Sequence, residues 1–235
     1  MSRLPLVQLR GLAKSFPEGE ATRTVFRGLD AEIARGESVA LLGRSGSGKS
    51  TLLNLVGGID LPTEGEVVLD GTNLTRLSER ERTLFRRRHI GLVFQSFNLI
   101  PTLTVIENLL LPLELNGRTD AAARAAALDL LGRIGLADSA GTYPDRLSGG
   151  EQQRIAVARA VVHDPLLLLA DEPTGSLDAE SGSRVLELLF GLARKEGRAM
   201  IVVTHNDAVA RSADRVLALR DGRLVEETAP AGPPA

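Results

Sequence analysis

The stretch SVALLGRSGSGKSTLLNLV, residues 38–56, decides the fold of this 235-residue chain. It starts as an apolar run typical of a buried strand, passes through a glycine-rich loop and continues in a pattern typical of a helix. Glycines in such a loop allow positive φ, so that backbone N–H groups can point inward, and the following helix adds positive charge at its N-terminus. The stretch therefore predicts a strand–loop–helix unit that cradles phosphate groups.

The loop and the start of the helix supply the expected nucleotide-binding residues Gly43, Arg44, Ser45, Gly46, Ser47, Gly48, Lys49, Ser50 and Thr51. Lys49 would offer a compact ammonium group to the β- and γ-phosphates, and the hydroxyl of Ser50 would bind Mg²⁺. The chain has 28 basic residues, of which only Lys14, Lys49 and Lys195 are lysines. A lysine at the position that needs a point charge favours a functional loop over a chance glycine-rich turn. We therefore expect Mg·ATP as the ligand.

The rest of the chain alternates strand-like and helix-like patterns. Apolar runs typical of strands lie at 6–9, 66–69, 91–94, 166–170, 199–204 and 215–220, and helical patterns at 78–87, 121–134, 150–162 and 179–195. This alternation predicts an α/β layered fold. Because 98–162 is mostly helical in pattern, we expect one domain with a core lobe of about 1–97 and 163–227, an inserted helical lobe of about 98–162 and a flexible tail at 228–235.

Composition and charge argue against several classes of protein. A net charge of −2 gives no field that would favour nucleic acid, so we expect no nucleic-acid partner. The absence of cysteine excludes a disulfide framework and a thiolate metal site. No run approaches the 18 consecutive apolar residues of a membrane-spanning helix, and the first ten residues lack the pattern of a signal peptide.

A second group of polar residues follows two predicted strands. The apolar run at 166–170 ends in Asp171 and Glu172, and His205 follows the run at 199–204. Parallel strands deliver such residues to one edge of the sheet, where ligands bind. We expect Asp171 to bind Mg²⁺ and Glu172 to act as the general base that orients the attacking water. His205 would contact the γ-phosphate or hold Glu172 in place.

A second helix N-terminus is predicted at Ser148, with Gly149 and Gly150 after it and Glu151 three residues on. This spacing matches a capping box. A well-capped helix and nothing more explains the pattern as well as an anion site does, and the residues themselves leave both interpretations open.

The sequence Leu-Ser-Gly-Gly-Glu-Gln-Gln-Arg at 147–154, together with the phosphate loop and Asp171-Glu172, resembles the ATP-binding cassette (ABC) ATPases. The resemblance covers nearly the whole chain, from about Val7 to Val225. It implies a P-loop NTPase (RecA-like) core with an N-terminal antiparallel β subdomain and an inserted α-helical subdomain. It also implies a head-to-tail homodimer, in which the phosphate loop of one subunit and Ser148, Gly149 and Gly150 of the other clamp one ATP.

The resemblance assigns further roles by position. Gln95 matches the glutamine that touches Mg²⁺, Asp178 lies in the loop that couples the two sites, and His205 matches the switch histidine. The catalytic group then consists of Lys49, Glu172 and His205. Phe16 falls where an aromatic residue stacks on adenine, with a core role as the alternative. Ser176 and Asn206 depart from the residues that are common in the family, and neither removes a catalytic group.

The stretch 97–112 and Glu151 resemble one subgroup, the ATPases of lipoprotein-releasing and macrolide-export type transporters. This implies a membrane permease partner with four membrane helices and a large periplasmic domain, and a place on the cytoplasmic face of the bacterial inner membrane. The alternatives are a soluble cassette of the iron–sulfur assembly type and a cell-division ATPase. A GTPase would carry Asn-Lys-x-Asp, which is absent, and a kinase would leave 147–154 unexplained.

Two other segments have two interpretations each. The apolar segment 99–115 is expected to be partly core and partly a groove in which the permease docks. The arginine-rich segment 80–89 favours a solvated helix face, with contact to lipid or the permease as the alternative.

Overall fold

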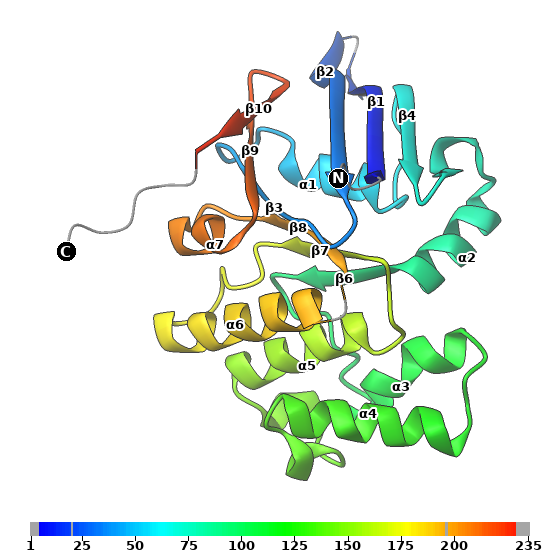
Figure 1. The fold of residues 1–235 in the computed structure, drawn as a ribbon, viewed down its shortest axis with the longest axis vertical. Coiled ribbons are helices and arrows are strands. Elements are labelled where there is room, and N and C mark those ends of the chain that lie inside the picture. The colour runs from blue at the N-terminus through cyan, green and yellow to red at the C-terminus, as the bar shows by residue number, and fades with distance from the viewer. Residues whose placement is uncertain (1–4, 20, 196, 229–235) are drawn as a thin grey trace.

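The computed structural model describes residues 5–19, 21–195 and 197–228, and Figure 1 shows their arrangement. The predicted tail therefore lies outside the described residues, apart from Thr228. The strands are β1 (Pro5–Glu18), β2 (Ala21–Ala34), β3 (Ser38–Leu42), β4 (Glu64–Leu69), β5 (Thr72–Asn73), β6 (Ile90–Phe94), β7 (Leu167–Asp171), β8 (Ala199–Val203), β9 (Arg215–Arg220) and β10 (Arg223–Glu227). The helices are α1 (Lys49–Val56), α2 (Glu79–His89), α3 (Val105–Leu115), α4 (Ala121–Arg133), α5 (Gly149–Val161), α6 (Ala179–Lys195) and α7 (Asp207–Ser212), with short 3₁₀ turns at Leu74–Arg76, Ala137–Ser139 and Pro144–Arg146.

The central sheet has the strand order β10-β9-β3-β8-β7-β6, and all of its strands except β10 run parallel. The register aligns the strand ends: Asp171 pairs with Phe94 on one side and with Val203 on the other, and Val203 pairs with Leu41. Segments that follow β3, β6, β7 and β8 therefore leave the sheet at one edge. This edge is where the candidate site is built.

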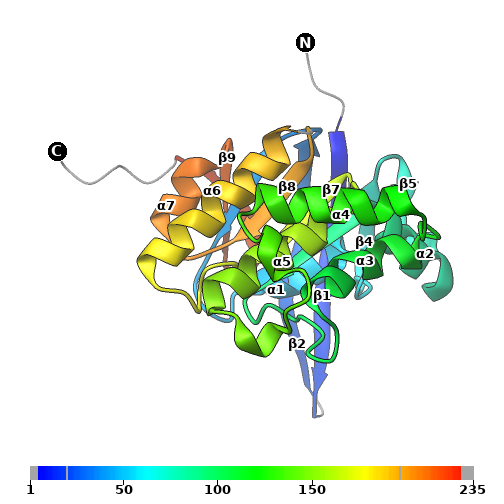
Figure 2. The ribbon, with the colours of Figure 1, turned by 90° about the horizontal axis from the view of Figure 1, so that it is seen from below.

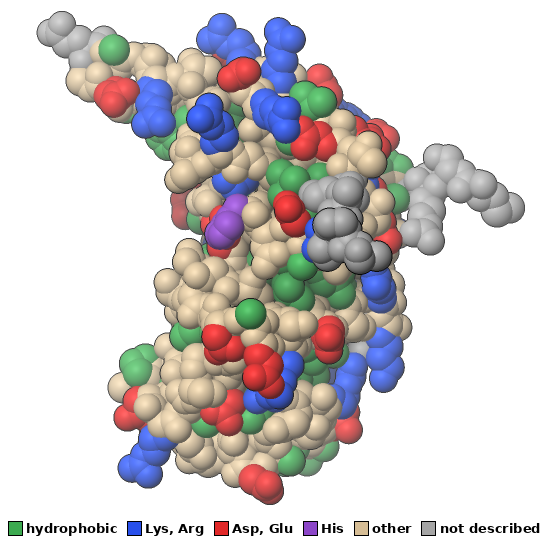
Figure 3. All heavy atoms as spheres, turned by 90° about the vertical axis from the view of Figure 1, so that its left-hand side faces the viewer, with side chains coloured by type: hydrophobic (Ala, Val, Ile, Leu, Met, Phe, Trp, Pro, Cys, Tyr) green, Lys and Arg blue, Asp and Glu red, His purple; other side chains and the backbone are tan. Residues whose placement is uncertain are grey.

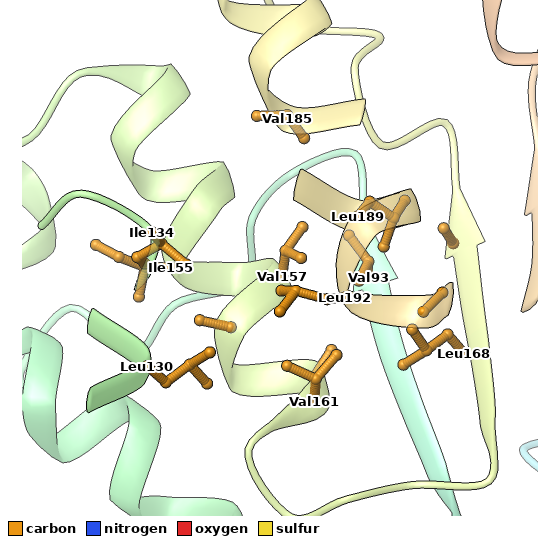
Figure 4. Packing of buried hydrophobic residues seen from close by; sticks show 14 of the residues in the cluster. Val93, Leu130, Ile134, Ile155, Val157, Val161, Leu168, Val185, Leu189 and Leu192 are labelled. Carbon is orange, nitrogen blue, oxygen red and sulfur yellow. The ribbon is translucent and has the colours of Figure 1, made fainter. Parts of the chain in front are cut away.

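The parallel strands are apolar along their whole length because helices or a second sheet cover both faces. In β7, Leu167 and Leu169 join the core on the side of α1, whereas Leu168 and Ala170 join the core under α5 and α6. Figure 4 shows the second core, in which Leu168 and Val93 of the sheet meet aliphatic side chains of the helices. Helix α1 is enclosed, because its apolar residues share a core with both sheets.

The second sheet, with the order β2-β1-β4-β5, is antiparallel. Its first two strands form a hairpin that is much longer than the run at 6–9 predicted from the sequence. Register shifts near Leu9, Leu12 and Lys14 break the strict alternation of buried and exposed residues, and Gly11 in this stretch has a φ of 56°. Because strand prediction relies on that alternation, the rest of the hairpin was missed.

Helices α3, α4 and α5 lie below the central sheet, where α6 also packs against α5 (Figures 1 and 2). The sequence predicts mostly helical structure over 98–162 but no bounds for helix α3, because Pro112 and the threonines of the segment 99–115 favour a surface groove there. The helix forms despite this proline: Thr104 and Glu107 make a capping box, and Asn116 at the other end donates to the carbonyl of Pro112. Among the described residues, no helix is long and apolar enough to cross a membrane.

The arginine-rich helix α2 is less solvated than the sequence suggests. Arg82 is 6% exposed, and its Nε donates to the carbonyl of Gly58 at 3.0 Å. Arg86 donates to the same carbonyl at 2.7 Å. These two arginines thus bind the segment that follows α1, which corrects the interpretation of 80–89 as a solvated face; Arg80 and Arg88 do remain exposed.

Candidate functional site

The phosphate loop connects β3 to α1 and needs glycine at both of its ends. Gly48 caps α1 with a φ of 102°, and a Cβ atom there would lie 2.3 Å from Cγ1 of Val25 in β2. A Cβ atom on Gly43 would lie 2.8 Å from Oγ of Ser47 and 2.9 Å from the carbonyl oxygen of Leu219. Neither position has room for a side chain, so the backbone itself must form the surface of the loop.

Lys49 is the first residue of α1 and is only 9% exposed. Its ammonium group donates to the carbonyl of Gly43 at 2.8 Å and to that of Arg44 at 3.1 Å. The side chain therefore folds back across the loop and places its charge inside the curve of the backbone. The N-terminus of α1 adds its positive dipole end at the same point, which makes this loop an anion-binding site.

A cleft of about 800 Å³ opens beside the loop, within the range of volumes typical of small-molecule sites. The functional residues that line it are Phe16, Gly43, Ser45, Gly46, Gly48, Lys49, Ser50, Thr51, Gln95, Glu172 and His205, together with Arg23. Phe16 is 40% exposed, which excludes the core role that the sequence left open. Most of the predicted phosphate-loop residues and the predicted catalytic residues thus share one cleft with an aromatic ring.

An adjoining cleft of about 1190 Å³ contains the two remaining loop residues, Arg44 and Ser47. Its walls also carry basic side chains of β2, β9 and β10, namely Arg23, Arg27, Arg220 and Arg223. Figure 3 shows basic side chains gathered toward the top of this face of the molecule. Arginines on several elements thus line this cleft together with Asp207, Asp221 and Glu227, and Arg220 is paired with Glu227.

A smaller cleft of about 260 Å³ brings together residues from the ends of β6 and β7 and the start of α1. Ser50, Gln95, Asp171 and Glu172 all line it. Oδ1 of Asp171 is buried and has no hydrogen-bond partner among the described residues. A buried carboxylate oxygen without a partner is costly unless a cation or a donor meets it, so this atom points to a ligand.

Glu172 and His205 are in direct contact across the edge of the sheet. Nδ1 of His205 lies 2.6 Å from Oε2 of Glu172, and the backbone N–H of Glu172 donates to the carbonyl of Val203. Glu172 has a φ of 49°, an uncommon conformation for a residue other than glycine. The histidine thus holds the carboxylate at the mouth of the cleft, in agreement with one of the two roles expected for it.

The remaining predicted residues lie away from the phosphate loop of the same chain. Ser148 and Glu151 form the predicted capping box, with the backbone N–H of Ser148 donating to Oε2 of Glu151 at 2.8 Å. The pKa of Glu151 is lowered by hydrogen bonds from the side chain and the backbone of Ser148. A Cβ atom on Gly150 would lie 3.0 Å from Oγ of Ser181, whose N–H donates to Asp178. Ser148, Gly149, Gly150 and Asp178 line neither the cleft beside the loop nor the smaller cleft at the sheet edge.

Two residues that the sequence did not single out connect helix α5 to the catalytic edge. Gln153 is fully buried, and its Nε2 donates to the carbonyl of Phe94 at 3.0 Å and to that of Pro173 at 2.6 Å. Arg159 donates to the carbonyl of Phe97 at 3.1 Å and to that of Asn98. The residues before Gln95 and after Glu172 are therefore held by one glutamine. In the sequence, the position of Gln153 on the apolar face of a helix was the feature that could have indicated this role.

Comparisons with known proteins find related sequences. The model of the family described as ABC transporter matches residues 26–175. An uncharacterized ABC transporter ATP-binding protein of Mycobacterium tuberculosis is 53% identical over 225 residues, covering 96% of this chain and 91% of that protein. The lipoprotein-releasing system ATP-binding protein LolD of Xanthomonas campestris pv. campestris is 45% identical, covering 94% and 92%. The macrolide export ATP-binding/permease protein MacB of Rhodopseudomonas palustris is 46% identical, covering 94% of this chain and 34% of that protein.

A solved structure has the same fold. It is described as a dimeric, post-hydrolysis state of an ATP-binding cassette bound to ADP and Pi. Its TM-score is 0.87 at 41% identity, and the match covers 96% of this chain and all of the other. The likeness confirms the predicted α/β nucleotide-binding fold and the resemblance that rested on 147–154.

Proposed function

This chain belongs to the ABC transporter family as an ATPase cassette, and from this premise we propose that it hydrolyses Mg·ATP as one half of a dimer that powers a membrane permease. The observation that carries the proposal is the meeting of the phosphate loop with Gln95, Asp171, Glu172 and His205 at one sheet edge. A phosphate cradle alone would support binding. The contact between Glu172 and His205 adds a positioned carboxylate, which can activate a water molecule as the nucleophile.

The triphosphate would lie in the loop between β3 and α1. Backbone N–H groups from Arg44 to Ser50 and the ammonium of Lys49 supply the positive field, which acts on the phosphate charges at close range. Lys49 would exchange its two carbonyl contacts within the loop for the β- and γ-phosphate oxygens. Phe16, which lines the same cleft and is 40% exposed, would stack on the adenine.

The side-chain oxygen atoms in the smaller cleft are suitable ligands for Mg²⁺. Ser50, Gln95 and Asp171 offer a hydroxyl, an amide oxygen and a carboxylate oxygen, and Mg²⁺ prefers oxygen ligands of this kind. The buried oxygen of Asp171 that lacks a partner is the specific feature that supports a cation here. When bound, Mg²⁺ neutralises charge on the phosphates and helps to orient them.

Glu172 would act as the general base. Its carboxylate accepts a proton from the water that attacks the γ-phosphorus, and ADP leaves on the opposite side. His205 holds the carboxylate through Nδ1, so that the base does not rotate away from the water. A base positioned in this way contributes about 10²–10⁴ in rate.

The second half of the site would come from another copy of the chain. Ser148 and Gly150 stand at the N-terminus of α5, a positive helix end, yet they lie with Asp178 and Ser181 rather than with the phosphate loop. A head-to-tail dimer would place this helix end against the γ-phosphate held by the partner. The solved ATP-binding cassette that matches 96% of this chain is dimeric, which supports a dimer here.

A membrane permease would be the second partner, and the chain would reach the membrane through it, at the cytoplasmic face of the bacterial inner membrane. The names of the LolD and MacB relatives support a transporter, and the resemblance of 97–112 supports a permease with four membrane helices and a large periplasmic domain. We expect it to dock in the groove predicted for the segment 99–115, which contains α3.

Substitution of the base tests this function. A Glu172→Gln variant should bind ATP, lose at least about 10²-fold in turnover and accumulate as an ATP-bound dimer. Phosphate release measures the turnover, and size-exclusion chromatography with ATP measures the dimer. Turnover at the rate of the unsubstituted protein would remove Glu172 from the mechanism.

A further inference from the structure

The cation of Lys14 covers the ring of Phe16, which lines the nucleotide cleft. The two residues are two positions apart in β1. Nζ of Lys14 lies 4.8 Å from the centroid of the Phe16 ring, within the range of a cation–π contact. Lys14 is 9% exposed, whereas Phe16 is 40% exposed. The ring thus has one part in contact with a buried cation and another part open to the cleft.

Other residues fix the ammonium group of Lys14 in place. It donates to the carbonyl of Leu61 at 2.8 Å and lies 2.7 Å from Oδ2 of Asp60. Partial burial raises the pKa of Asp60, but hydrogen bonds from Lys14 and the backbone of Leu61, with the charge of Lys14, bring it below its usual value. The carboxylate is therefore charged at neutral pH, and the ion pair persists under physiological conditions.

The anchor of Lys14 is part of the phosphate-loop unit. Asp60 and Leu61 follow α1, the helix whose first residue is Lys49, and the carbonyl of Gly58 in the same segment accepts hydrogen bonds from Arg82 and Arg86. A chain of contacts therefore runs from the phosphate loop along α1 to Asp60, Lys14 and the ring of Phe16. The distance between the phosphate cradle and the ring is set by this chain.

We infer that Lys14 is a positioning residue, which holds the ring of Phe16 ready to stack on the base of a bound nucleotide. This inference rests on the proposed function and adds a residue to it. An exposed phenylalanine that must be ordered when the nucleotide binds loses side-chain entropy at that step. A ring already held by a cation has lost that freedom before binding, so the stacking contact is gained at lower cost.

The ligand class follows from the chemistry of the ring. The side chain of Phe16 has no hydrogen-bonding group and recognises a base only through its flat aromatic surface. Adenine and guanine can therefore both stack on it. We therefore expect the Lys14–Phe16 pair to raise affinity for ADP and GDP alike and to leave phosphate binding unchanged. Because Asp60 neutralises Lys14, the lysine adds little attraction for the phosphates by its charge.

The test compares a nucleotide with a ligand that has no base. Titration calorimetry would measure Mg·ADP and Mg·tripolyphosphate binding to the full chain, to Lys14→Met, to Phe16→Ala and to the double variant. Lys195→Met, which removes the same charge at the exposed end of α6, is the matched control. Lys14→Arg is the conservative variant, since it keeps a cation on a similar stem.

Lys14→Met is expected to weaken Mg·ADP about three- to tenfold and to leave Mg·tripolyphosphate unchanged, which also shows that the phosphate loop stays folded. Phe16→Ala should weaken Mg·ADP at least as much, and adding Lys14→Met to it should have no further effect. Lys14→Arg should retain most of the affinity.

Four results would overturn the inference. Equal weakening of tripolyphosphate would show that Lys14 acts on the phosphates by charge. An additive double variant would show that it acts without Phe16. Unchanged ADP binding in Lys14→Met, while the unsubstituted chain binds ADP, would refute this inference alone, whereas a chain that binds no ADP at all would refute the proposed function and the inference with it.

Discussion

Gln153 connects helix α5 to both sides of the catalytic edge, and replacing it with methionine should impair turnover more than folding. Its amide nitrogen donates to the carbonyl of Phe94, next to Gln95, and to that of Pro173, next to Glu172. Methionine has a similar length and can fill the same space, but it cannot donate a hydrogen bond. The substitution therefore removes both connections without opening a large cavity.

The expected loss of stability follows from the hydrogen bonds of this one side chain. The buried carbonyl of Pro173 and the partly buried carbonyl of Phe94 lose a donor, at up to about 1–3 kcal/mol each. The side-chain oxygen of Gln153 is itself buried without a partner among the described residues, and removing it recovers about 1–3 kcal/mol. The net loss is about 1–3 kcal/mol, and a chain of this size loses about 2–4 °C in melting temperature for each kcal/mol.

The effect on turnover should be larger, because Gln95 and Glu172 lose the contact that fixes their spacing. A misplacement on the order of 1 Å costs up to about 10²-fold, so kcat should fall about 10- to 100-fold with little change in KM. Steady-state phosphate release measures both constants. Gln152→Met is the matched control, since the side chain of Gln152 donates, among the described residues, to the carbonyl of Leu147 beside its own helix. A Gln153→Met variant with unchanged kcat and a lower melting temperature would refute the positioning role.

Three further predictions concern the loop and the capping box. Gly48→Ala should abolish ATP binding in a calorimetric titration, because its Cβ atom would lie 2.3 Å from Val25, and unchanged affinity would contradict the loop geometry. Lys49→Ala should weaken ATP binding about tenfold or more, whereas unaltered binding would exclude a phosphate contact. The folded pKa of Glu151 is lowered from 4.5, so the stability that it contributes is complete above pH 4.5 and is lost as pH falls through the folded pKa. Thermal unfolding at neutral pH and at about pH 4 should show a smaller pH effect in Glu151→Gln, and an identical profile would contradict this.

The sequence predicted the parallel strands and the capped helices well, because their signals are local. The apolar run before Asp171 and the helical pattern at 179–195 are examples, and the predicted bounds of the helix agree with those of α6. The full length of the β1–β2 hairpin and the bounds of helix α3 were not predicted, for physical reasons. Bulges interrupt the alternation of buried and exposed residues in the hairpin. Pro112 is unfavourable inside a helix, but the capping box and tertiary packing stabilise α3 despite it.

The candidate site was predicted to the extent that its residues lie within recognisable motifs. The loop, Glu172 and His205 were found because each follows a strand directly, and strand ends meet at one edge. Gln153 contacts a residue 59 positions away in the sequence, and Lys14 contacts one 47 positions away. No local sequence pattern predicts such contacts. The features that could have drawn attention to these residues were a glutamine on an apolar helix face and a rare lysine in an arginine-rich chain.

A mixing experiment tests the central claim, a site shared between two copies, most directly. A Lys49→Ala variant and a Ser148→Arg variant should each be inactive as homodimers. In a mixed dimer, the intact loop of one subunit meets the intact helix end of the other, so the mixture should regain ATP turnover well above that of either variant. A mixture as inactive as its components, or a Ser148→Arg homodimer with full activity, would contradict the shared site.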